Sequence, residues 1–101
     1  VDPEYQKALG RKVSGYDENI WAPFRFNVVV AGNYLKFSQN EELKNKLLST
    51  KNKTIVEASY EDSVWGIGLH INDPRIFDES NWLGENLLGK AIMVVRETFQ
   101  N

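Results

Sequence analysis

The sequence predicts a single domain built mainly from helices, and three observations support this. Apolar residues recur every three or four positions over residues 20–35 and again near the C-terminus, which is the period of an amphipathic helix. The strand candidate, residues 55–58, is short. The 101 residues contain no internal repeat and no low-complexity linker, so they fit one domain with one core.

The longest predicted helix covers residues 20–36 and follows a shorter one over residues 4–13. The stretch Asp17-Glu18-Asn19 offers N-cap side chains just before the long helix. One apolar stripe of this helix is expected to face the core, and it consists of Ile20, Phe24, Val28 and Leu35.

Two further helices complete the prediction. One follows Ser38-Gln39-Asn40-Glu41, which has the S-x-x-E form of a capping box, and runs to about Thr50. The other runs from about Asn86 to Phe99, with Leu88, Ile92, Val95 and Phe99 on one face. Residues 59–85 between them are irregular and rich in Gly, Asn, Asp and Trp. Because a compact domain rarely keeps so long a loop without a function, we expect the functional site in this segment.

Composition excludes several classes of function. The formal net charge of −2 gives no electrostatic reason for strong nonspecific binding to nucleic acid. The chain has no cysteine, which excludes disulfides and thiolate metal sites within it. The apolar runs are too short to span a bilayer. We therefore expect a cytoplasmic protein with no membrane partner, no metal and no cofactor.

Three weaker motifs lie in or near the irregular segment. Gly84–Ala91 nearly matches the phosphate-binding pattern G-x-x-x-x-G-K-[ST], but Ala91 replaces the hydroxyl that would hold magnesium. Its glycines still offer the N–H groups of a helix start to an anion. His70, the only histidine, has no nucleophile elbow to accompany it and is expected to be a loop residue. Four acids of the loop have a spacing that matches no metal-binding motif; they are Asp62, Asp73, Asp78 and Glu79.

The strongest constellation is Glu57-Ala-Ser-Tyr-Glu-Asp62, followed by Trp65-Gly-Ile-Gly68. A carboxylate at the end of a strand and another in the following turn can both point into one cleft. Trp65 could form the floor of this cleft, and Gly66 would let a ligand approach the backbone. The alternative is that Trp65 belongs to the core and Asp62 only caps the turn.

Several motifs along the chain resemble one family. In order they are KALGRKV (7–13), DENIW (17–21) with Arg25, KFSQN (36–40), LLST (47–50), EAS (57–59), Asp62, WGIG (65–68), WLGENLLG (82–89) and MVVR (93–96). In this order and spacing, the sequence resembles the NADAR family, the YbiA-like N-glycosidases. The resemblance runs from about Ala8 to Arg96, which is nearly the whole chain.

The resemblance implies an α+β domain over residues 1–101, mainly helical with a small β-sheet. It also implies hydrolysis of a bond between ribose C1 and a nitrogen. Two substrate classes are associated with the family: phosphorylated ribosylamino-pyrimidine intermediates of riboflavin synthesis, and ADP-ribose attached to guanine in nucleic acid. The expected partners are therefore a small nucleotide-like molecule or ADP-ribosylated nucleic acid.

The resemblance places Trp21 and Asp62 in the active site, with Trp65 and Asn86 in the same pocket. Cleavage of a ribosyl C–N bond builds positive charge on the sugar, which a carboxylate stabilises. Asp62 suits this role, or that of a base for the attacking water, with Glu57 as its helper.

Substrate binding needs further groups. The flat leaving base can stack on Trp65 beside Gly66, and Trp21 is expected to lie close to Trp65 in the same cleft. A phosphate needs cations or N–H donors. The candidates are Arg11 and the helix start that ends at Gly89.

Members of the family carry a further N-terminal stretch with a Ser-Glu-His-Tyr-like motif, whose glutamate is a leading catalytic candidate. This chain has no counterpart, so we expect an N-terminally incomplete domain with a companion N-terminal segment, or one that has lost its activity. Two other classes of function stay open. One is a module that binds ADP-ribose or a nucleotide without cleaving it, and the other is an interaction scaffold.

Overall fold

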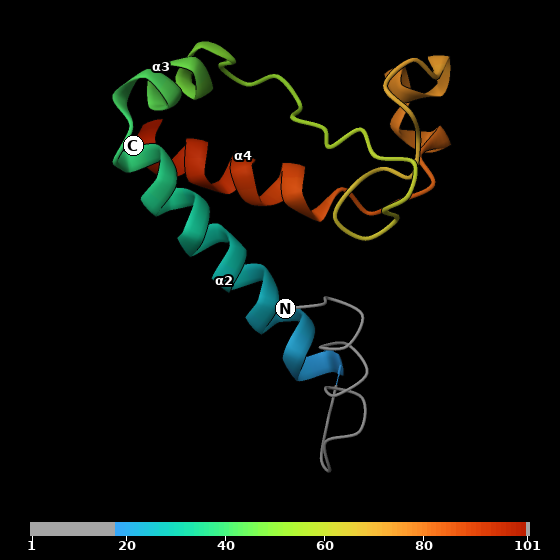
Figure 1. Cartoon of the computed structure of the whole chain (residues 1–101), viewed down its shortest axis with the longest axis horizontal. Helices are drawn as coiled ribbons and strands as arrows, with labels where there is room; N and C mark the ends of the chain where they lie inside the picture. Colours follow the sequence, from blue (N-terminus) through green and yellow to red (C-terminus); the bar gives the residue numbers. More distant parts are fainter. Residues whose placement is uncertain (1–17, 101) are drawn as a thin grey trace.

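The computed structural model describes residues 18–100, with side chains described from residue 21 onward. Its elements are α2 (Glu18–Ser38), α3 (Glu41–Ser49), the 3-10 helices η1 (Pro74–Phe77) and η2 (Glu79–Asn81), and α4 (Leu87–Gln100). α4 crosses α2 and runs beside α3, while the chain between α3 and α4 spreads out around the start of α4 (Figure 1). The shorter helix predicted over residues 4–13 lies outside the described residues.

The three long helices confirm the predictions from periodicity, and α2 includes the whole predicted range 20–36. The cap of α3 differs from the prediction. Its N-cap is Asn40, whose Oδ1 accepts a hydrogen bond from the Leu43 N–H at 3.1 Å. The Ser38 hydroxyl instead donates to the Leu35 carbonyl oxygen at the end of α2. The amide of Asn40 therefore takes the position that the capping-box pattern assigned to Ser38.

The helices pack where their C-terminal ends meet. The ring of Tyr34 in α2 stacks on Phe99 of α4, with 5.3 Å between the centroids, and the Lys44 ammonium of α3 lies 4.7 Å from the Phe99 centroid. Arg96 is buried in α4 and donates through Nη1 to the Thr50 hydroxyl at 2.8 Å, which joins α4 to the end of α3. The small hydrophobic core of the described chain consists of Leu47, Ile67, Leu69, Ala91 and Val95.

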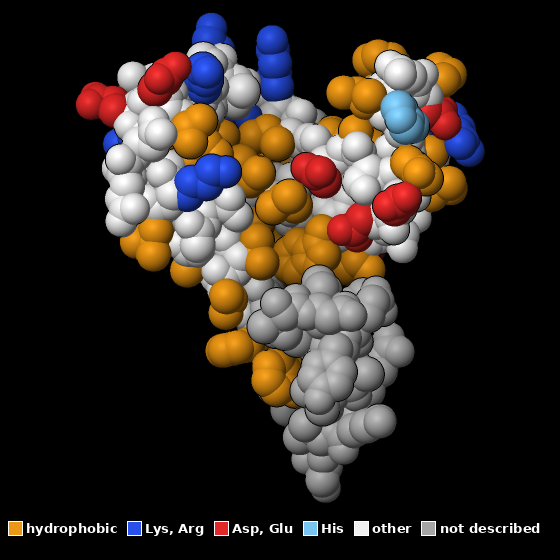
Figure 2. Space-filling view, viewed as in Figure 1, with side chains coloured by type: hydrophobic (Ala, Val, Ile, Leu, Met, Phe, Trp, Pro, Cys, Tyr) orange, Lys and Arg blue, Asp and Glu red, His pale blue; other side chains and the backbone are white. Residues whose placement is uncertain are grey.

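The predicted orientation of α2 is wrong. Phe24, Val28 and Leu35 were assigned to the core, but their side chains are between 54% and 57% exposed. The half-buried side chains form a different stripe, which consists of Phe26, Val29, Val30, Asn33 and Phe37. Apolar residues occupy most of the circumference of α2, so periodicity could not choose between its faces. The first turns of α2 also extend away from α4 (Figure 1), and hydrophobic side chains are exposed along this arm (Figure 2).

The predicted α+β class is also wrong, because residues 18–100 contain no β-strand. In the strand candidate, residues 55–58, the backbone groups form hydrogen bonds with groups outside any neighbouring strand. The side-chain amide of Asn86 bonds to the backbone of Ile55 and Glu57, and the Glu57 carbonyl oxygen accepts from the Ile67 N–H at 3.0 Å. A sheet needs a ladder of backbone bonds, and here one side chain replaces the second strand.

Residues 59–85 are irregular, as predicted, apart from the two 3-10 turns. An aspartate caps each turn: Asp73 accepts from the Arg75 N–H at 2.9 Å, and Asp78 accepts from the Ser80 N–H at 3.0 Å. None of the helices in the described part of the chain is both long and apolar enough to cross a membrane.

Candidate functional site

The predicted site lies where residues 54–57, the loop 62–68 and the start of α4 meet. Asn86 joins the first of these segments to the third. Its side chain is only 1% exposed, and its Oδ1 accepts from the Glu57 N–H while its Nδ2 donates to the Ile55 carbonyl oxygen, both at 2.9 Å. Its φ of 55° lies in the left-handed region, which asparagine adopts more readily than most residues. Asn86 therefore fixes residues 55–57, the extended segment, against the start of α4.

Backbone hydrogen bonds attach the loop to the start of α4. The N–H groups of residues 85–88 donate to the carbonyl oxygens of residues 63–66 at 2.9–3.1 Å. The pairs are Glu85 with Ser63, Asn86 with Gly66, Leu87 with Val64, and Leu88 with Trp65. A helix start normally leaves four N–H groups without an intrahelical partner, and here the loop uses several of them. An anion at this helix start would compete with the loop carbonyls.

Gly66 brings the two predicted carboxylate residues together. It is buried, and a Cβ added to it would lie 2.9 Å from the Asp62 carbonyl oxygen and 3.0 Å from the Glu57 carbonyl oxygen. Glu57 and Asp62 therefore flank the same glycine. The missing side chain is required because the chain approaches itself here, so the space beside Gly66 is occupied by backbone atoms.

Asp62 holds the turn that carries Trp65. Its Oδ1 accepts hydrogen bonds from the N–H groups of Val64 at 2.9 Å and Trp65 at 2.8 Å. These bonds fix the carboxylate relative to the residue that bears the indole. They also show that Asp62 caps the turn, which was the alternative to a role in the active site. A carboxylate has several acceptor positions, so capping through Oδ1 is compatible with a second role.

Asn86 and Gly89, both predicted to bind substrate, contact the chain itself. The amide of Asn86 uses its oxygen and its nitrogen on the backbone of residues 55–57. A Cβ added to Gly89 would collide with the Ile55 carbonyl oxygen and with the Asn86 amide. Both residues therefore position the extended segment, and direct contact with a substrate stays a prediction.

The remaining predicted residues lie in different surroundings. Trp21 is 42% exposed on α2, and its ring meets Phe24 edge-on with 5.8 Å between the centroids. Trp65 is half-buried. The expected approach of Trp21 to Trp65 stays a prediction. Arg11 lies outside the described residues.

Three other titratable groups of the loop, Asp73, Asp78 and His70, have structural partners. Arg75 forms an ion pair with Asp73, with 2.7 Å between Nη2 and Oδ2, and the side-chain hydrogen bond lowers the pKa of Asp73 to about 2. A hydrogen bond from the Ser80 side chain lowers the pKa of Asp78. Nδ1 of His70 accepts from a backbone N–H two residues on. Within residues 18–100, no three His, Cys, Asp or Glu side chains converge as a metal site would require.

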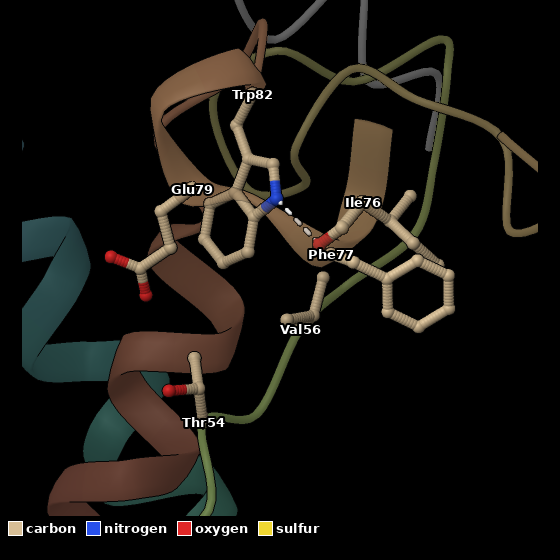
Figure 3. A pocket seen from close by; sticks show the side chains of 6 residues that line it. All are labelled: Thr54, Val56, Ile76, Phe77, Glu79 and Trp82. Carbon is tan, nitrogen blue, oxygen red and sulfur yellow. Dashed lines mark hydrogen bonds between the residues drawn. The ribbon is translucent and has the colours of Figure 1, made fainter. Parts of the chain in front are cut away.

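The same region contains an open hollow of about 300 Å³ that the sequence did not predict (Figure 3). We call it the Trp82 hollow, and its lining residues are Thr54, Val56, Ile76, Phe77, Glu79 and Trp82. The Trp82 Nε1–H donates to the Ile76 carbonyl oxygen at 2.9 Å, and the Phe77 ring is 89% exposed. None of the predicted site residues lines this hollow. The signal that could have found it is the apolar pair Ile76-Phe77 within the polar stretch DPRIFDES (73–80).

Comparison with known proteins decides the family. The NADAR domain matches residues 1–100. The chain belongs to the NADAR family. The resemblance inferred from the separate motifs is thereby confirmed.

Curated relatives of this NADAR chain are longer than it is. An N-glycosidase of Acanthamoeba polyphaga mimivirus is 50% identical over 94 residues, which make up 93% of this chain and 55% of the relative. An N-glycosidase of Nostoc punctiforme is 31% identical over 99 residues, which make up 98% of this chain and 56% of the relative. A riboflavin biosynthesis protein of Vibrio vulnificus is 30% identical over 92 residues, 91% of this chain and 22% of that protein. The chain therefore spans about half the length of the two N-glycosidases.

Proposed function

We propose that this NADAR chain belongs to an N-glycosidase that hydrolyses the bond between ribose C1 and a nitrogen. The observation that carries the proposal is that the backbones of Glu57 and Asp62 both lie against Gly66, and that hydrogen bonds fix the Asp62 carboxylate in the turn that ends at Trp65. The names of two relatives support the reaction class, and the name of the third supports a substrate from riboflavin synthesis. The finer candidates are ribosylamino-pyrimidine phosphates and ADP-ribose attached to guanine.

In the proposed reaction the C1–N bond breaks, a water oxygen bonds to C1, and a proton goes to the leaving nitrogen. The transition state carries positive charge on the ribose ring. The Asp62 carboxylate stabilises this charge or removes a proton from the water, with Glu57 as its helper. Trp65 holds the flat base by stacking, which is worth ~1–3 kcal/mol per base. Trp21 forms a second wall of the pocket, and Arg11 binds the phosphate.

The substitution Asp62→Asn tests the catalytic assignment. Because Asn keeps an Oδ1 acceptor for the N–H groups of Val64 and Trp65, the turn and the fold should persist. Because Asn lacks the charge, turnover should fall by roughly 10²-fold or more. The assay measures release of free ADP-ribose or ribose 5-phosphate, with the chain alone and with the chain joined to the additional segment of the mimivirus relative.

Glu61→Gln is the matched control, since Glu61 is an exposed neighbouring acid, and it should leave turnover unchanged. Asp62→Ala separates the two roles of Asp62, because it removes the turn acceptor together with the charge. A rate for Asp62→Asn close to that of Glu61→Gln, in a form of the protein that is active, would contradict the catalytic role. Glu57 or the additional segment would then carry the chemistry.

A second function is favoured by the capping bonds of Asp62. If that carboxylate serves only the turn, the pocket binds ADP-ribose or a nucleotide without cleaving it. Calorimetric titration with ADP-ribose, together with a search for products from a ribosylated substrate, distinguishes the two. Saturable binding with the substrate left intact supports the binding module, and product release supports the N-glycosidase.

A further inference from the structure

The Trp82 hollow is distinct from the proposed catalytic turn. Thr54 and Val56 line it from alternate positions of an extended segment. Val56 lines the hollow, whereas Glu57, Asp62 and Trp65 are not among its lining residues. A ligand in this hollow would therefore contact residues other than the proposed catalytic ones.

The hollow offers preformed aromatic surface. The Trp82 ring is half-buried and held in place by the bond from Nε1 to the Ile76 carbonyl oxygen. The exposed Phe77 ring adds apolar area on the other side of Val56 (Figure 3). A flat ligand could bury part of this surface without reordering the indole, which lowers the entropic cost of binding.

The two polar side chains of the hollow lie on the same side of it. In Figure 3 the Glu79 carboxylate and the Thr54 hydroxyl lie on one side, and the Phe77 ring lies on the opposite side. Within residues 18–100, the Glu79 carboxylate has no hydrogen-bond or ion-pair partner. An exposed carboxylate next to aromatic surface can accept hydrogen bonds from a ligand that the rings hold.

The one charged side chain among the lining residues is the carboxylate of Glu79. Asp78 lies between the lining residues Phe77 and Glu79, and the hydrogen bond from Ser80 lowers the pKa of Asp78, which keeps it ionised at neutral pH. The nearby Asp73 is neutralised by its ion pair with Arg75. Asp78 and Glu79 therefore repel phosphates and carboxylates, and they attract N–H donors and cations.

We propose that the Trp82 hollow binds a planar group that carries two neighbouring N–H donors on an N–C–N edge and has no negative charge. Its flat face lies against the aromatic side chains, and its edge donates two parallel hydrogen bonds to the Glu79 carboxylate. Two sources share this chemistry: a 2-amino-oxopyrimidine ring, as in guanine, and a guanidinium, as in arginine.

The test follows the indole N–H signals by NMR. The chain has three tryptophans, and the variant Trp82→Phe assigns the signal of Trp82. Titration with guanosine or with N-acetyl-arginine amide should shift this signal saturably, with a Kd on the order of 1 mM for so small and open a site. The tighter of the two probes identifies the source. Inosine, which lacks the exocyclic amino group, and N-acetyl-citrulline amide, which lacks the charge, should bind at least about threefold more weakly.

Exposed residues supply variants that keep the fold. Glu79→Gln should weaken binding of the better probe about tenfold, since a carboxylate becomes an amide that can accept only one such bond. The matched control Glu85→Gln changes an exposed glutamate outside the hollow and should have no effect. Phe77→Ala should weaken binding about threefold through lost apolar contact.

Two further outcomes decide the proposal. Guanosine 5′-monophosphate should bind more weakly than guanosine, because its phosphate meets the negative rim. Tighter binding of the monophosphate, equal affinities of Glu79→Gln and Glu85→Gln, or no saturable shift of Trp82 with either probe would each overturn the proposal. None of these results depends on whether the chain hydrolyses a glycosidic bond.

Discussion

α2 and the loop that joins α3 to α4 differ in the burial of their side chains, and the less regular of the two regions is the more deeply buried. α2 is a helix of 21 residues, yet none of its side chains from residue 21 to residue 38 is fully buried. The loop has no regular structure apart from two 3-10 turns, yet its residues Ile67 and Leu69 are 0% and 1% exposed. In this protein, burial does not follow regular secondary structure.

The difference arises from where the backbone hydrogen bonds go. A helix satisfies its own N–H and carbonyl groups, so α2 keeps its shape without burying a whole face. The loop has no internal ladder, and its backbone needs partners elsewhere in the chain. It finds them in the Asn86 amide and in the N–H groups of residues 85–88. We therefore expect the structure of the loop to depend on a few residues, whereas α2 should tolerate substitution at most of its own positions.

The largest effect is expected for Asn86→Leu. The change leaves the part-buried Glu57 N–H and Ile55 carbonyl oxygen without their partner, and it places a branched side chain at a φ of 55°. An unsatisfied buried group costs ~1–3 kcal/mol, so we expect a loss of about 3–5 kcal/mol in the free energy of unfolding, measured with urea. The control is Asn33→Ala in α2, whose amide bonds only to the Val29 carbonyl oxygen of the same helix. It should change stability by less than about 0.5 kcal/mol. Equal losses for the two variants would remove the distinction between loop and helix.

Two glycines sharpen the comparison, because replacement by alanine should lower the stability of the protein at one of them and raise it at the other. Gly89→Ala places a methyl group against the Ile55 carbonyl oxygen and the Asn86 amide, so it should destabilise by about 1–3 kcal/mol. Gly32→Ala lies in α2, where a Cβ meets nothing within 4 Å, so it should stabilise by about 0.5–1 kcal/mol. Thermal unfolding of both variants measures the two signs. A stabilising Gly89→Ala would mean that the extended segment is not held close to α4.

The smallest effect concerns the exposed turn at η1. The side-chain hydrogen bond from Arg75, followed by the bond from the Arg75 backbone N–H, lowers the pKa of Asp73 from 3.8 to about 2. A lowered pKa in the folded state contributes stability that is present above pH 3.8 and is lost as the pH falls towards about 2. Arg75→Gln should raise the pKa of Asp73 towards its ordinary value, as seen by NMR titration of the carboxyl carbon. Because the pair is exposed, unfolding at neutral pH should hardly change. An unchanged pKa in the variant would show that the backbone N–H alone lowers it.

The helices were predictable because their signals are local. On α4 the predicted face is confirmed, with Val95 buried and with Leu88, Ile92 and Phe99 half-buried. The irregular character of residues 59–85 was also predictable from composition. For the candidate site, the sequence indicated that Glu57, Asp62 and Gly66 belong together, and the structure places the two acidic residues beside this glycine. The catalytic and binding roles of these residues stay predictions.

The errors have physical reasons in particular residues. The strand prediction for residues 55–58 failed because an asparagine side chain, rather than another strand, bonds to the backbone. The packed face of α2 was misassigned because both of its faces are apolar. The Trp82 hollow was missed because it gathers side chains from two stretches that are far apart in the sequence, residues 54–56 and 76–82.

The sequence by itself determined the family, the positions of the three long helices and the location of the irregular segment. Motifs and helical periods can be recognised from short stretches of sequence, because the hydrogen bonds and caps of a helix join residues only three or four positions apart. The tertiary structure alone decided which face of α2 packs, that residues 55–58 form no sheet, and that aromatic and acidic side chains surround a hollow. These features depend on contacts such as those of Asn86 with Ile55 and Glu57, which are 31 and 29 residues away. No local pattern encodes such a contact, because its energy comes from satisfying backbone groups that only the folded chain brings together.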